Sequence, residues 1–324
     1  AADVVLPDGV FASDVSLEVL NDDESHVLML KVVDPASYPS GIWVGGVNSD
    51  MSNPLNWKNL SIPKSGDPLD FSGIQNDVAV EADIEGVTFG AVTMGEKVVT
   101  FTGSLTATSF SDTSKVAVGA NSTVTLDGNL EISGSSDAYI VNSVADGGRF
   151  IVTGRIVGTG DFTGANIYQC MKCGGGSVIA GGVESNTGTS GDDWTFRLIG
   201  AENGTVKLTV GADGISGSKK YYLSKTSSKT AEIQPLDSNF NISAWIGNRA
   251  NLVLNTTGTD GNAHEIKISG GGGISRDGTL KISGSGKVVA DYSWNQTGET
   301  YCNMPITVVD TSTLAIKAGK KIST

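Results

Sequence analysis

Apolar and polar residues alternate in short runs along nearly the whole chain. Clear examples are VTLDGNLEI (124–132), RFIVTGRIV (149–157), TVKLTV (205–210) and HEIKIS (264–269). Each run is rich in β-branched residues and ends at Gly, Asn, Asp or Ser, which is typical of a half-buried strand followed by a turn. No window of twelve or more residues has the 3.6-residue apolar period of a capped helix. The chain is therefore predicted to be all-β.

A phrase made of a strand, an SG or TG pair and a second strand recurs along the chain. It occurs as LEISGSSDAYIV, FIVTGRIVGTGDFTG, IKISGGGGI and LKISGSGKVV. Glycine at a corner permits positive φ, so short strands can follow each other around a sharp bend. The similar phrases TLKISGSGKV (279–288) and TLAIKAGKKI (313–322) are interpreted as equivalent parts of successive coils. Stacked coils bury one face of every strand on shared columns of Val, Ile and Leu, which favours a parallel β-solenoid.

Composition and charge exclude several functions. Charged residues make up 18% of the 324 residues, against about 25% in average globular proteins. The 35 acidic residues outnumber the 22 Lys and Arg residues, and the formal net charge is −13. This charge repels phosphate backbones, so no nucleic-acid partner is expected. No apolar stretch approaches the length of a membrane span, so no membrane-spanning segment is predicted.

The N-terminal sequence AADVVLPDG has neither the basic nor the apolar region of a signal peptide. Small residues beside a cleavage site suit signal-peptide removal, so the chain is predicted to be a mature protein that is secreted or at the cell surface. A cytosolic protein with an arbitrary start is the alternative.

The three cysteines are too few for a disulfide scaffold. Cys170 and Cys173 form a CMKC pair, and Cys302 lies far from both. A zinc site would need two further ligands, but His26 and His264 are each isolated. The CMKC pair is interpreted as a local disulfide or two free thiols, and neither a metal nor another cofactor is expected.

Two parts of the chain resemble the autotransporter-associated β-strand repeats of bacterial surface and secreted proteins. One part runs from LIGAENGTVKLTVGADGIS (198–216) through residues 243–322. The positions that match the repeat motif there are Gly273–Ile274, Gly278–Thr279–Leu280, Ser283–Gly284, Tyr301, Thr307–Val308 and Thr313–Leu314. The other part, residues 41–73, is similar to a segment that often precedes these repeats, with Trp43, Trp57, Pro63, Gly66–Asp67 and Phe71 in its motif.

The resemblance implies a right-handed parallel β-helix with coils of roughly 20–30 residues. We expect an N-terminal hairpin or cap in residues 1–40, a tryptophan-containing segment in 41–77 and the solenoid in 78–324. The hairpin would cover the open end of the solenoid, with Leu28 and Leu30 facing the core. A separate small β unit is the alternative.

The last repeat is not followed by a recognisable cap. Repeat proteins normally end in a cap, so the favoured interpretation is that the chain is the front part of a longer or processed protein. The alternative is end-to-end self-association, because open strand edges invite pairing with another molecule, through Thr313, Leu314, Ile316 and Ile322.

An enzyme remains the weaker interpretation. Asp192 and Asp193 in SGDDW resemble the paired aspartates of β-helical polygalacturonases, in which two carboxylates cleave a glycosidic bond. The other motifs of that family do not occur here, so the pair is better interpreted as a solvated turn. A polysaccharide lyase would use a basic residue near acidic calcium ligands, and Arg149 and Arg155 have Asp146 and Asp161 nearby. In a chain with many acidic residues, this grouping is expected by chance.

Carbohydrate binding without catalysis depends on the tryptophans. Trp194 and Trp294 lie beside polar loops, where their rings could stack on sugars. Trp43, Trp57 and Trp245 are instead expected to fill a corner or cover an open end of the solenoid.

The predicted function is an extracellular structural or adhesive protein with a rigid β-solenoid and no catalytic site. Its predicted partners are other copies of itself or surface glycans. The alternative function is a β-helix protein that binds or cleaves carbohydrate.

Overall fold

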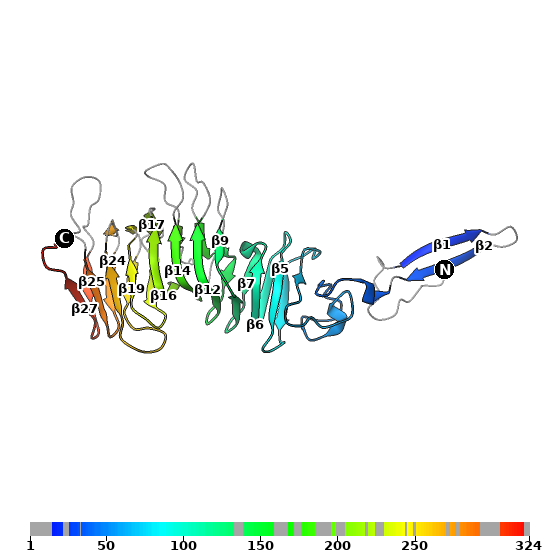
Figure 1. The fold of residues 1–324 in the computed structure, drawn as a ribbon, viewed down its shortest axis with the longest axis horizontal. Helices are drawn as coiled ribbons and strands as arrows, with labels where there is room; N and C mark the ends of the chain where they lie inside the picture. The colour runs from blue at the N-terminus through cyan, green and yellow to red at the C-terminus, as the bar shows by residue number, and fades with distance from the viewer. Residues whose placement is uncertain are drawn as a thin grey trace.

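The computed structural model describes residues 15–21, 26–32, 34–132, 139–158, 168–171, 176–185, 196–198, 205–217, 220–223, 230–243, 245–248, 251–269, 273–275, 279–291 and 305–320. Strands make up 54% of it, and the described residues contain no α-helix. The strands follow one another along a single long axis (Figure 1). The predicted all-β parallel solenoid is confirmed.

The described strands stack into three faces, and the chain visits them in the same order wherever a coil has described strands on all three. Face 1 is a parallel sheet of eleven strands: β3 (Leu69–Asp70), β5 (Thr88–Thr93), β6 (Val99–Phe110), β8 (Thr123–Leu126), β12 (Arg149–Gly158), β14 (Ser177–Ser185), β16 (Thr205–Gly217), β18 (Thr230–Pro235), β21 (Asn251–Asn255), β24 (Thr279–Ser283) and β26 (Ile306–Val308). Face 2 contains β9 (Leu130–Ile132), the second halves of β12, β14 and β16, then β19 (Phe240–Ile242), β22 (Glu265–Ile268), β25 (Lys287–Ala290) and β27 (Thr313–Ile316).

Where its strands are described, face 3 precedes face 1 in the coil, and it consists of two parallel sheets. The first contains β4 (Val78–Ala82), the first half of β6, β7 (Val116–Val118) and β11 (Ser143–Val144). The second contains β10 (Tyr139–Val141), β13 (Tyr168–Met171), β15 (Phe196–Leu198), β17 (Lys220–Leu223), β20 (Trp245–Asn248) and β23 (Gly273–Ser275). Cys170 lies on β13 and Trp245 on β20, and the side chains of both lie outside the described part of the chain.

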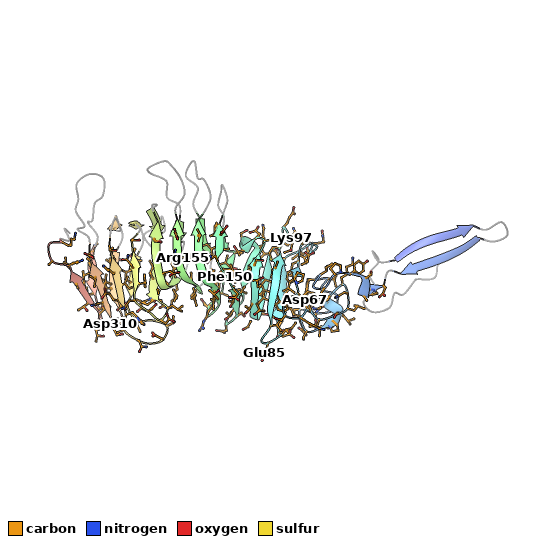
Figure 2. All side chains as sticks on the ribbon, viewed as in Figure 1. Asp67, Glu85, Lys97, Phe150, Arg155 and Asp310 are labelled. Carbon is orange, nitrogen blue, oxygen red and sulfur yellow. The ribbon has the colours of Figure 1, made fainter. Side chains whose placement is uncertain are left out.

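The core consists of aliphatic and aromatic side chains stacked in register from coil to coil. On face 1 the buried ladder runs through Leu105, Val124, Phe150, Val178, Leu208, Ile233, Leu254 and Ile282. On face 2 it runs through Leu130, Ile156, Val183, Ile215, Ile242, Ile268 and Ala290. Figure 2 places Phe150 in the middle of this stack. Because side chains alternate between the two sides of a strand, alternating sequences bury every second residue.

The repeated phrase near the end of the chain does not mark equivalent positions, so that interpretation is wrong. Residues 279–283 lie on face 1 and pair with β26, whereas Thr313 lies on face 2 and pairs with Lys287. The corner at Gly284 instead stacks on Asp310, 26 residues later, whose Oδ2 accepts a hydrogen bond of 3.1 Å from the Gly284 amide. Both faces have the same apolar alternation, so similarity of sequence cannot tell one face from the other.

Residues 41–73 enclose the first coils with aromatic side chains. Trp43 and Trp57 are both buried, and their rings meet edge to face with centroids 5.0 Å apart. Phe71 contacts Trp43 on one side and Phe101 of β6 on the other. The indole Nε1 of Trp57 donates a hydrogen bond of 2.8 Å to the Met51 carbonyl. Both tryptophans therefore fill the core, as the sequence suggested.

The predicted hairpin exists as β1 (Val15–Asn21) and β2 (His26–Val32). The two strands are antiparallel, with Leu17 opposite Leu30 and Val19 opposite Leu28, and among described strands they pair only with each other. In Figure 1 the hairpin extends beyond residues 41–73, away from the coils. The described residues that enclose the first coils are therefore those of 41–73. The side chains of Leu28 and Leu30 lie outside the description, and the boundaries at 40 and 77 stay predictions.

Candidate functional site

The predicted assembly residues lie on the last described coil. Thr313, Leu314 and Ile316 belong to β27, where Leu314 is half-buried against the core. Ile316 is 48% exposed, and Val308 on neighbouring β26 is 44% exposed. Both side chains continue buried ladders, because Ile316 pairs with Ala290 and Val308 with Ile282. This coil therefore presents apolar side chains, and self-association through it stays a prediction.

Several predicted site residues lie outside the described part of the chain. They are Asp192, Asp193, Trp194, Trp294 and Ile322, together with Cys173, Cys302 and Asp161. The predictions that depend on them stay untested.

The arginines considered for a lyase do not converge on one site. Arg155, labelled in Figure 2, lies on β12. It binds Glu184 at 2.7 Å and Asp213 at 3.0 Å, so its guanidinium joins three successive coils. Arg149 is exposed on face 1, and Asp146 is exposed at the preceding corner. Within the described ranges, no group of three or more His, Cys, Asp or Glu side chains could hold a metal ion. Arg155 therefore links neighbouring coils through its ion pairs.

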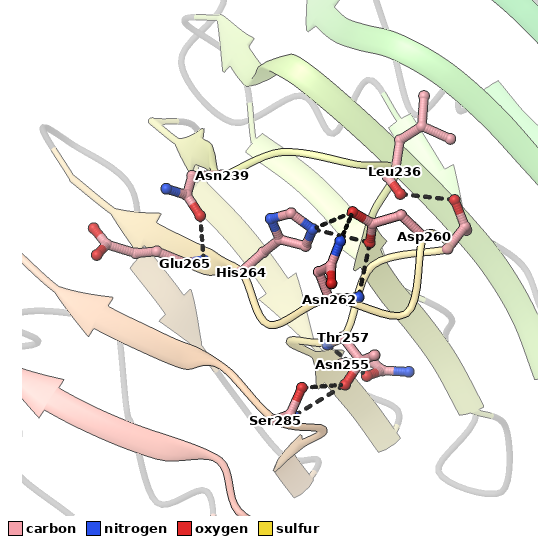
Figure 3. A network of polar contacts seen from close by, with 10 residues as sticks. Leu236, Asn239, Asn255, Thr257, Asp260, Asn262, His264, Glu265 and Ser285 are labelled. Carbon is pink, nitrogen blue, oxygen red and sulfur yellow. Dashed lines mark hydrogen bonds and ion pairs between the residues drawn. The ribbon is translucent and has the colours of Figure 1, made fainter.

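A polar loop projects at the corner between faces 1 and 2, in residues 256–264 (Figure 3). Its two sides are joined by an antiparallel bridge between Thr257 and Ala263. At its tip, Asp260 accepts hydrogen bonds from the Asn262 amide at 3.0 Å and from Asn262 Nδ2 at 2.8 Å. His264 Nε2 lies 3.1 and 3.2 Å from the two carboxylate oxygens. These contacts, the Asn262 amide foremost, lower the pKa of Asp260 to about 2.

Beside this loop lies a groove of about 370 Å³ at the same corner. We call it the corner groove. It is lined by Asn239, Ala263, His264, Glu265, Ser285, Gly286, Lys287 and Thr313. These residues belong to four successive coils, since β19 pairs with β22, β22 with β25 and β25 with β27. The corner groove therefore crosses several coils, and no single stretch of sequence contains it.

The charged groups of the corner groove neutralise each other. Lys287 Nζ lies 2.8 Å from Glu265 Oε2, and both side chains remain partly exposed. At the other end of the same face 2 strands, Asp291 contacts Lys267 at 3.1 Å and Lys317 at 2.9 Å. These ammonium groups, Lys317 first, lower the pKa of Asp291 below its usual value. Face 2 therefore carries ion pairs that link neighbouring coils at both ends of its strands.

A second, larger groove lies between residues 41–45 and the start of the solenoid. Its volume is about 510 Å³, and it is lined by Ile42, Trp43, Val44, Gly45, Lys58, Gly73, Ile74, Gln75, Asn76 and Val78. Lys58 Nζ lies 4.0 Å from the centre of the Tyr38 ring, within the range of a cation–π contact. Trp43 is only 4% exposed, so it offers this groove little ring surface.

The chain matches no family model, no curated protein and no solved structure. No helix among the described residues is long and apolar enough to cross a membrane. The resemblance to autotransporter-associated repeats therefore stays an expectation from sequence. The corner groove was not predicted, although two of the quoted runs contain most of its residues. HEIKIS contains His264 and Glu265, and TLKISGSGKV contains Ser285, Gly286 and Lys287.

Proposed function

We propose that this chain is a structural and adhesive element, secreted or displayed at a bacterial surface, whose function depends on a rigid solenoid and involves no catalysis. The observation that carries the proposal is the continuous stack of buried side chains on faces 1 and 2. A solenoid gains its stability from contacts between neighbouring repeats, so an uninterrupted stack favours a stiff rod. Eleven strands on face 1, at about 4.8 Å per strand, give a sheet about 50 Å long.

The pairing of charged side chains supports the non-catalytic part of the proposal. Four basic side chains each bind a carboxylate on a neighbouring coil, namely those of Arg155, Lys267, Lys287 and Lys317. A catalytic pair of carboxylates in a glycosidase faces the scissile bond from two sides. The described ion pairs instead run along the wall and link one coil to the next.

Small-angle X-ray scattering of the full chain tests the rigid rod. We expect the distance distribution of an elongated particle with one cross-section, at several protein concentrations. Ile233→Asp places a charge in the face 1 ladder and should abolish that profile, because an unpaired buried charge is costly. Thr230→Asp on the same strand, where Thr230 is half-buried, is the matched control and should keep it. A profile typical of a flexible chain for the unmutated protein would reject the proposal.

A further inference from the structure

We propose that the corner groove binds a neutral, hydroxyl-rich ligand, namely one or two rings of an uncharged glycan. This inference rests on the adhesive part of the proposed function. It places the binding site at the corner between faces 1 and 2, rather than at the tryptophans suggested by the sequence.

The lining of the corner groove has the chemistry that sugar hydroxyls require. It contains an amide, an imidazole, a carboxylate, an ammonium group and two hydroxyls, and its only apolar side chain is that of Ala263. An ammonium group has three donors and a carboxylate about four acceptor positions. The ion pair between Lys287 and Glu265 uses one oxygen of the carboxylate, Oε2. Adjacent donors and acceptors of this kind suit neighbouring hydroxyls, each of which both donates and accepts.

Charge favours a neutral ligand over an acidic one. Lys287 is balanced by Glu265 at 2.8 Å. His264 lies against Asp260, which is a carboxylate at neutral pH because its pKa is about 2. The chain as a whole carries a net charge of −13. An anionic sugar would therefore meet an unfavourable field without a free cationic partner in the groove.

The walls of the corner groove are held in place by hydrogen bonds from neighbouring coils. Asn239 Oδ1 accepts from the Glu265 amide at 2.6 Å. Thr257 Oγ1 accepts from the Ser285 amide at 2.9 Å and lies 3.1 Å from Ser285 Oγ. The His264 carbonyl accepts from the Lys287 amide at 3.0 Å. A ligand that enters a groove ordered in advance loses less affinity to the ordering of the protein.

Gly286 lines the corner groove with backbone atoms alone. A Cβ atom there would lie 2.1 Å from the His264 carbonyl oxygen, so a residue with a side chain cannot occupy the position without displacing the neighbouring coil. The Gly286 amide is held by Thr256 Oγ1 at 2.9 Å. The volume of about 370 Å³ is at the lower end of the usual range for ligand sites. This size suits a short glycan segment lying along several coils.

A binding screen with the full chain is the first test. Immobilised neutral oligosaccharides (gluco-, manno- and galacto-oligosaccharides) are compared with uronic-acid and sialylated ones, with serum albumin as the protein control. We expect binding to at least one neutral series and none to the acidic ones. Binding to acidic glycans alone, or to no neutral glycan above the albumin signal, would overturn the inference.

Matched variants then locate the site by calorimetry with the best neutral trisaccharide. Lys287→Met and Glu265→Gln should each weaken binding at least tenfold. Lys267→Met, which removes a lysine from the same strand as Glu265 but outside the lining, and Glu232→Gln on face 1 should leave affinity within twofold. Equal affinity in all four variants would refute the corner groove as the site. Trp194→Ala and Trp294→Ala test the alternative location. Loss of binding in those two variants only would also refute the corner groove as the site.

Scattering profiles separate this inference from the proposed function. A rod-like profile without glycan binding rejects the corner groove alone. A flexible profile in the unmutated chain rejects the structural proposal itself. Variants of the corner groove are interpreted only when their profiles match that of the unmutated protein.

Discussion

Residues 41–73 and the coils of residues 230–291 enclose apolar cores in different ways. The first region packs Trp43, Met51, Trp57 and Phe71 around irregular backbone. The second stacks Leu and Ile in register, such as Leu252 on Leu280. In a coil that lies between two others, each buried side chain packs against a similar side chain in the coil before it and in the coil after it. A region that packs against coils on one side only fills its volume with large rings and with hydrogen bonds from side chains to backbone.

Asn56 is an example of the hydrogen bonds from side chains to backbone in residues 41–73. It is fully buried, yet its Oδ1 accepts from the Val47 amide at 3.1 Å. Its Nδ2 donates to Asn48 Oδ1 at 2.6 Å and to the Asp50 carbonyl at 2.8 Å. A buried amide that satisfies this many backbone and side-chain groups replaces the strand pairing that neighbouring coils provide elsewhere. Mutations in the two regions are therefore expected to differ in how much stability they cost and in how many strands they affect.

The largest effect is expected for Trp57→Ala. Removing a fully buried indole leaves a cavity and deprives the Met51 carbonyl of its hydrogen bond. The variant should lose about 3–5 kcal/mol of stability, measured by urea denaturation of the full chain with hydrogen exchange as a local probe. Trp57→Phe keeps most of the packing but not the hydrogen bond. Its stability should therefore lie between that of the unmutated chain and that of Trp57→Ala. A loss below about 1 kcal/mol would show that the aromatic cluster is not a cooperative core.

A somewhat smaller and more local effect is expected for Leu254→Ala. Leu254 is buried between Ile233 and Ile282 on face 1. Its truncation should cost about 2–5 kcal/mol and speed amide exchange in β18, β21 and β24, but not in β5 or β6, because repeats contact only their neighbours. Val253→Ala on the same strand is the matched control, since Val253 is only half-buried. Faster exchange along the whole solenoid would contradict this localisation.

The smallest effect is expected for Asp260→Asn, and it should depend on pH. The folded-state pKa of Asp260 is about 2, below the ordinary value of 3.8 for an aspartate. The ionised form therefore stabilises the loop above the unfolded-state pKa, and this contribution is lost as pH falls from about 4 to about 2. Thermal midpoints at pH 6, 4 and 2 should show the unmutated chain above the variant at pH 6 and the two converging at pH 2. A difference that does not change with pH would show that the carboxylate charge plays no part in the loop.

Much of the local structure could be predicted from the pattern of residues. The run NLVLN is half-buried at Asn251, Val253 and Asn255 and buried at Leu252 and Leu254, as its alternation indicates. The burial of Trp43 and Trp57 also agrees with the expectation from sequence. These features depend on neighbours within one strand or one short segment.

The corner groove could not be predicted in the same way. Its charged pair comes from β22 and β25, and Asn239 and Thr313 come from the coils on either side. The separation of residues joined by hydrogen bonds between coils varies, for example from 17 positions (Met94 and Ser111) to 30 positions (Thr256 and Gly286). Loops of different length therefore decide which residues meet. The mistaken equivalence of residues 279–288 and 313–322 has the same cause, since both are alternating strands that lie on different faces.

The amino-acid sequence alone determined that the chain forms short strands, where those strands turn and which side of each strand faces the core. All three depend on the local alternation of side chains across a pleated strand. Only the tertiary structure decided which strands stack on one another and which corner residues gather into a groove. Those outcomes depend on how many residues each loop inserts between strands, because one inserted residue moves every later side chain to another place in the stack.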